Sequence, residues 1–168
     1  MQHPVRHSLA VLATTLALAS TGLAQAQAVR TERNMSLDLA SRIASATVAA
    51  CSANGYNVTA AVVDRAGQLR ALYRADNAGP HTVGAAQAKA FTSASARNTT
   101  TAMLENSQKN PGAANLGQIP GFLLVGGGVP VKVGNDTIGA VGVGGAPGGH
   151  LDEQCAMTAL DKVKDLLQ

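Results

Sequence analysis

Two histidines, His81 and His150, are the residues of this sequence best suited to metal binding or proton transfer. The other two, His3 and His7, lie in an N-terminal segment that we expect to be removed. His81 stands just before an expected helix, where the positive end of the helix dipole disfavours a charged imidazole. We therefore expect His81 to keep a ring nitrogen free as a metal ligand. The alternative is a turn histidine that only hydrogen-bonds the backbone.

His150 precedes two acidic residues, Asp152 and Glu153, with which it could form a metal site. A closed metal site needs three or four ligands, and no Cys-x-x-Cys or His-x-x-x-His spacing supplies them. We interpret His150 as part of a solvated loop before a helix.

Two aspartates and two glycine-rich segments are weaker candidates. Asp64 and Asp76 could pair as acid and base, but the capping of turns explains both. Segments 126–128 and 144–149 could bind an anion through backbone N–H groups, yet neither has the spacing of a phosphate-binding loop. The sequence predicts close turns in both places.

The chain has two cysteines, Cys51 and Cys155, which are far apart in sequence. In an exported protein such a pair tends to oxidise, and closing so long a loop would stabilise the fold by about 4 kcal/mol. Two independent buried thiols are the alternative.

Residues 1–28 have the pattern of a cleavable secretory signal peptide. Arg6 precedes an apolar run over residues 9–20, and residues 24–28 (AQAQA) offer two overlapping Ala-x-Ala cleavage sites. The run is shorter than the roughly 20 residues that span a bilayer. We expect a periplasmic or secreted protein with a single domain over residues 29–168 and no membrane span after cleavage.

The composition argues against nucleic acid as a partner. The formal net charge is +3, and aromatic residues make up 2% of the chain. The basic residues are scattered, without the dense run that neutralises phosphates or the aromatic rings that stack on bases. The core must therefore be built mainly from Ala, Val, Leu and Ile.

The first half of the chain predicts a helix, a hairpin and a helix pair. Ser36 is the expected N-cap of a helix that reaches residue 53 with Cys51 on its inward face. Thr82 is the expected N-cap of the middle helix. The remaining expected elements are strands at 57–63 and 68–74 and helices at 83–96 and 100–108.

The second half predicts three strands and a final helix. The strands are expected at 121–125, 129–133 and 137–143, and the helix at 151–167, with Cys155 at the flank of its apolar stripe. This order predicts an α+β fold. We expect one five-stranded antiparallel sheet with the terminal helices on one face and the middle helix on the other.

Several blocks of sequence resemble the GlcG/HbpS family, and they occur in order along nearly all of the expected mature chain. In the front half they are residues 62–69 (VVDRAGQL), 76–82 (DNAGPHT) and 88–93 (AKAFTS). In the back half they are residues 126–130 (GGGVP), 139–145 (GAVGVGG) and 152–156 (DEQCA). The family also includes the C-terminal domain of PduO-type cobalamin adenosyltransferases. The resemblance implies a profilin-like α+β sheet and, in many members, haem binding, secretion and homo-oligomers.

Haem binding would give several residues a role. The resemblance points to His81 as the iron ligand. Arg74, Lys89 and Arg97 are candidate cations for the haem propionates, and Phe91 is a candidate apolar contact. Arg65 flanks the same region. With so few aromatic residues, we expect a shallow or inter-subunit site.

The function expected from the resemblance is haem storage, sensing or slow degradation. Two alternatives stay open: an enzyme acting on a small organic acid or related metabolite at the His81 site, and a module that regulates a membrane partner.

Overall fold

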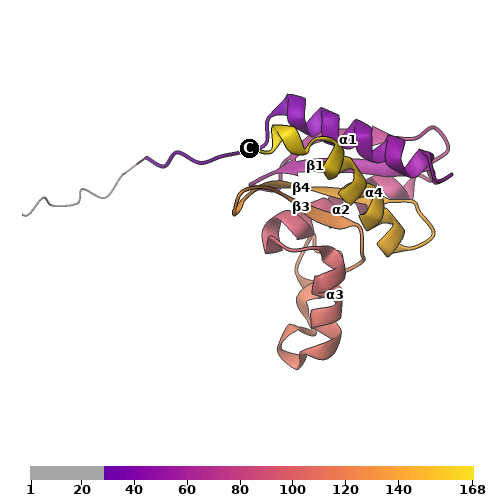
Figure 1. Cartoon of the computed structure of the whole chain (residues 1–168). Coiled ribbons are helices and arrows are strands. Elements are labelled where there is room, and N and C mark those ends of the chain that lie inside the picture. The colour runs from indigo at the N-terminus through magenta and orange to yellow at the C-terminus, as the bar shows by residue number, and fades with distance from the viewer. Residues whose placement is uncertain (1–28) are drawn as a thin grey trace, which may run out of the picture. The chain divides into compact units, whose positions relative to one another are not determined.

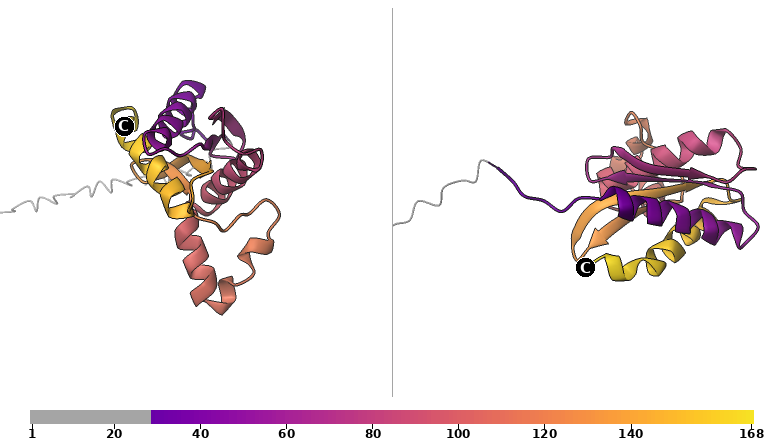
Figure 2. Two further views of the ribbon diagram at one scale, coloured as in Figure 1. Left: turned by 90° about the vertical axis from the view of Figure 1, so that its right-hand side faces the viewer. Right: turned by 90° about the horizontal axis from the view of Figure 1, so that it is seen from above.

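A four-stranded antiparallel sheet lies between two helical layers in this computed structural model, which describes residues 29–168 (Figure 2). Residues Glu32–Gln168 form one compact unit, to which the following description applies. The expected signal peptide, residues 1–28, lies outside the described residues. No helix in the described part of the chain is long and apolar enough to cross a membrane.

Helix α1 (Leu37–Ser52) begins where the sequence predicts. Ser36 Oγ accepts a hydrogen bond from the Leu39 N–H at 3.2 Å, which confirms Ser36 as the N-cap. The expected hairpin follows as β1 (Thr59–Asp64) and β2 (Leu69–Arg74). Asp64 stabilises its turn, because its Oδ1 accepts the N–H groups of Ala66 and Gln68 at 2.9 and 3.0 Å.

The sheet has the strand order β2-β1-β4-β3, so β1 and β4 are central and β2 and β3 are the edges. Strands β3 (Gly128–Val133) and β4 (Asp136–Gly144) pair antiparallel, and β4 also pairs with β1. Every residue of β1 is buried, as expected for a central strand covered on both faces.

The expected strand over residues 121–125 does not form, so the sheet has four strands rather than five. This segment lies against helix α2 (His81–Ala96) instead of joining the sheet. The Leu123 N–H donates to Thr92 Oγ1 at 2.8 Å, and the Phe122 ring contacts Phe91 edge to face, with centroids 6.1 Å apart. A short apolar run can be buried by a helix as well as by a neighbouring strand.

The helices cover the sheet as expected: α1 and α4 (Gly149–Lys162) on one face and α2 on the other (Figures 1 and 2). Val62 and Val141 belong to the core beneath α1 and α4, whereas Val63 and Ala140 face α2. Helix α2 packs directly on the β4 backbone, because a Cβ at Gly142 would lie 2.1 Å from the Ala86 carbonyl oxygen. The position of α2 therefore depends on this glycine.

Helix α3 (Thr100–Lys109) extends away from the sheet (Figure 1). Thr99 caps it by accepting the Ala102 N–H at 3.2 Å. Two short 3₁₀ turns, Pro111–Ala113 and Leu116–Gln118, follow and lead back towards β3.

Candidate functional site

An open, mostly apolar groove lies beside the outward face of α2. Its main hollow has a volume of about 450 Å³, within the range of small-ligand pockets. Three segments form it: the β1–β2 hairpin, the exposed side of α2, and the chain just before residue 122. The lining residues are Val63, Gly67, Leu69, Gly84, Gln87, Ala88, Phe91, Pro120 and Gly121.

Phe91 is the aromatic residue of this hollow. Its ring is held closely between two turns, because a Cβ at Gly67 would lie 2.7 Å from Phe91 Cδ2 and one at Gly121 would lie 3.2 Å from Cε1. Phe122 contacts the same ring. The wall that Phe91 provides is therefore fixed by its neighbours.

His81 belongs to the same face of α2 as this hollow. His81, Gly84, Ala88 and Phe91 follow one another at spacings of three or four residues, which places them in one row along a helix. His81 and Phe91 are ten positions apart, which corresponds to about 15 Å along the helix. The imidazole and the apolar hollow thus lie along one surface.

The His81 imidazole is exposed at the first residue of α2. Its ring lies against the backbone of the preceding turn, since a Cβ at Gly79 would be 2.8 Å from His81 Cε1. Among residues 29–168, no protein group hydrogen-bonds or ion-pairs with this ring. The ring is therefore available to a ligand.

The start of α2 differs from the expectation, because Thr82 is not the N-cap. The helix begins at His81, and Thr82 is a buried residue of its first turn. Thr82 Oγ1 donates to the Gly79 carbonyl at 2.6 Å and lies 2.7 Å from Thr59 Oγ1 on β1. The hydroxyl connects the first turn to the sheet instead of capping the helix.

Arg74 ends β2 beside the start of α2. It pairs in register with Thr59, whose hydroxyl contacts Thr82, and its guanidinium donates a hydrogen bond to the Ala78 carbonyl. Arg74 is exposed and so presents a cation near His81. Arg97 is exposed at the opposite end of α2, where its φ of 56° ends the helix.

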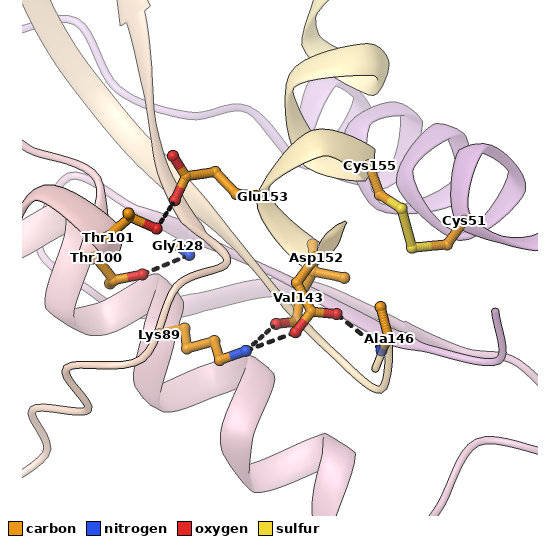
Figure 3. Close-up of polar contacts among 10 residues, drawn as sticks. All are labelled: Cys51, Lys89, Thr100, Thr101, Gly128, Val143, Ala146, Asp152, Glu153 and Cys155. Carbon is orange, nitrogen blue, oxygen red and sulfur yellow. Dashed lines mark hydrogen bonds and ion pairs between the residues drawn. A yellow bond between two sulfur atoms is a disulfide. The ribbon is translucent and has the colours of Figure 1, made fainter. Parts of the chain in front are cut away.

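Lys89 lies on the opposite side of α2 and is buried, so its expected role as a surface cation does not fit its placement. Its Nζ donates to Asp152 Oδ2 at 2.7 Å and to the Val143 carbonyl at 2.8 Å, and both charged side chains are only 4% exposed (Figure 3). Burial raises the pKa of the Asp152 carboxyl, while the hydrogen bond and charge of Lys89 oppose that rise. The pair joins α2, β4 and α4.

His150 lines a second hollow, of about 490 Å³, between α3 and α4. Asp152 is not available there, because its second oxygen accepts the Ala146 N–H at 3.0 Å in addition to the contact with Lys89. Glu153 accepts a hydrogen bond from Thr101 at 2.6 Å. Residues 29–168 contain no group of three or more His, Cys, Asp and Glu side chains that could hold a metal ion.

Cys51 and Cys155 form a disulfide between α1 and α4, with their Cα atoms 5.3 Å apart (Figure 3). Of the two alternatives left open by the sequence, the structure contains the bonded pair. The bridge joins residues 104 positions apart and so connects the first helix to the last.

Comparison with known proteins gives the class of this domain. Residues 35–161 match the HbpS-like family, which is described as "Haem degrading protein HbpS-like". The chain belongs to this family, as the resemblance in its sequence predicted.

The chain is similar to Protein GlcG of Escherichia coli (strain K12), with 36% identity over 115 residues, or 68% of this chain and 84% of that protein. A double mutant of Streptomyces reticuli HbpS is 31% identical with a TM-score of 0.77, covering 94% of this chain and 99% of that one. A solved PduOC–haem complex is 22% identical with a TM-score of 0.64, covering 71% and 88% of the two chains, and shares the fold.

Proposed function

We propose that this chain is an exported haem-binding protein, acting as an oligomer in haem storage, sensing or slow degradation. Membership of a family described by haem degradation supports a haem-related role. The PduOC structure, which contains haem, has the same fold. The disulfide is compatible with a periplasmic or secreted location.

The observation that carries the proposal is an exposed imidazole in line with an apolar groove. Haem needs an axial ligand for its iron, apolar contact for its macrocycle and cations for its propionates. His81, Phe91 and Arg74 provide these three kinds of contact around one face of α2. Arg97 is a further candidate cation, farther along the helix.

The groove is open and lies at the surface, which favours a shallow site. A second copy of the chain could cover the exposed side of a bound macrocycle, so we propose that the site lies near a subunit interface. In this proposal His81 would hold the haem iron, and Phe91 and Arg74 would orient the macrocycle.

A haemin titration followed by the Soret band tests this function. We expect a saturable change with the wild-type protein, and a loss of affinity of at least about tenfold with an altered band in His81→Ala, because an axial ligand is removed. His150→Ala is the matched control and should behave like the wild type, since His150 lies at the second hollow.

Two results would contradict the proposal. Absence of any saturable change in the wild type would remove haem binding, and an equal loss in both histidine variants would remove His81 as its specific ligand. If a thermal-shift screen found stabilisation by a small organic acid and none by haemin, that result would favour the alternative function, an enzyme acting on such a metabolite. Sedimentation with and without haemin would test the oligomer.

A further inference from the structure

Gly84 is an unusual residue for its place in the protein. It is the fourth residue of the 16-residue helix α2, and glycine inside a helix is less favourable than alanine. A Cβ at this position would meet no atom within 4 Å outside the helix's own local backbone. Nothing in the described part of the chain therefore requires glycine here.

Other glycines of the domain contrast with Gly84. A Cβ at Gly142 would collide with the backbone of α2, and one at Gly67 would come within 2.7 Å of the Phe91 ring. These glycines have an internal reason, namely the close packing of the protein on itself. Gly84 faces the open hollow instead, where only a group from outside the folded chain could come close.

The surroundings of Gly84 indicate what that group is. It lies one turn from His81 and one turn from Ala88 in the row that also contains Phe91, and Leu69 lines the same hollow. Arg74 adds a positive charge near the His81 end, which complements the propionates of haem. The row thus offers an iron ligand, a stretch without side-chain bulk, and an aromatic wall.

We propose that Gly84 is a specificity-determining residue of this site: its missing side chain lets the apolar edge of a haem macrocycle approach the α2 backbone between His81 and Phe91. This inference rests on the proposed function. Any side chain at residue 84 would hold the macrocycle away from the helix and weaken its contact with both ends of the row.

The test uses substitutions that separate stability from binding. Gly84→Ala should raise the melting temperature by about 2–4 °C, because it adds helix propensity without a clash. The same change should weaken haemin binding by about fivefold or more in the Soret titration, and Gly84→Leu by about fiftyfold or more. The opposite signs of these effects distinguish lost ligand contact from damage to the fold.

Ser45→Leu is the matched control for the size of the added side chain. Ser45 is exposed on α1, which covers the other face of the sheet, so this variant should bind haemin like the wild type. Circular dichroism of each variant verifies that its helices are intact.

The possible failures can be told apart. If the wild type binds haemin and both Gly84 variants bind equally well, the role of Gly84 is wrong and the proposed function stands. A wild type that does not bind haemin overturns both. A lower melting temperature of Gly84→Ala, or a changed oligomeric state with unchanged haemin affinity, would show that protein packing is the reason for the glycine and would overturn the inference.

Discussion

At the residue scale, His81 depends on the buried threonine beside it. Thr82 joins the first turn of α2 to Gly79 and to Thr59 on β1, so the backbone that carries the imidazole is held by the sheet. Arg74 holds the same turn through Ala78. The exposed imidazole is therefore attached to a well-supported turn, which its proposed role in ligand binding requires.

The buried ion pair of Lys89 and Asp152 can be tested directly by substitution. We expect Asp152→Leu to lower the free energy of unfolding by about 3–5 kcal/mol, because it leaves the Lys89 ammonium buried without its partner. The double variant Lys89→Met with Asp152→Leu should recover most of that loss, since neither charge remains. Urea unfolding of the single and double variants measures both quantities.

The single substitutions Lys89→Met and Asp152→Leu should thus be strongly non-additive in their effects on the free energy of unfolding. If the double variant lost as much free energy of unfolding as the two single variants lose in total, the two side chains would not act as a pair.

The spacing of Lys89 and Asp152 along the sequence already indicates that both lie on buried helix faces. Lys89 falls in the row of small buried residues of α2 that includes Ala86 and Ser93, and Asp152 shares the buried row of Cys155 and Ala159 on α4. A single charge on an otherwise apolar helix face requires a buried partner. The identity of that partner follows only from the three-dimensional packing.

At the scale of the elements, the helices and the hairpin were predictable because their signals are local. Ser36 marks the start of α1, and Asp64 with Gly67 marks the turn of the hairpin. The prediction of a strand over residues 121–125 was wrong, because this segment packs on Phe91 of α2 instead, and Phe91 is distant in sequence. The start of α2 was misplaced because the Thr82 hydroxyl bonds to β1 as well as to its own turn.

The bridge between the first and last helices predicts a loss of stability on its removal. Replacing Cys51 and Cys155 together by alanine should lower the free energy of unfolding by about 2–5 kcal/mol. Denaturant unfolding of the oxidised wild type against this variant measures the difference.

A reducing agent should destabilise the wild type and leave the alanine variant unchanged. Free thiols on both cysteines in unreduced wild-type protein, detected by mass spectrometry, would contradict the bridge.

At the scale of the whole molecule, the arrangement of layers could be predicted, whereas the groove could not. Each amphipathic helix must cover a face of the sheet, and in the structure α1 and α4 cover one face while α2 covers the other. The groove arises where β2, α2 and residues 120–121 meet, and no one segment carries its signal. His81 could be proposed as a candidate ligand nevertheless, because only two histidines lie beyond the expected signal peptide.

Export with cleavage of residues 1–28 is a prediction that concerns the whole chain. If the N-terminal segment is a cleaved signal, the intact mass of protein recovered from the periplasm or medium should correspond to a chain that begins at Val29 or two residues earlier. A mass that retains residues 1–28 would contradict cleavage. A variant with Ala26 and Ala28 replaced by bulky residues is the control, because it should remain uncleaved.

One turn of α4 has a consequence for conditions in which thiols are reduced. Cys155 reaches α1 on one side, while Asp152, three residues earlier, reaches α2 on the other. Reduction breaks only the first of these attachments. A molecule that has not yet been oxidised should therefore already have α2 seated and ligand affinity close to its final value. It would lack only the part of the resistance to unfolding that the disulfide adds on oxidation.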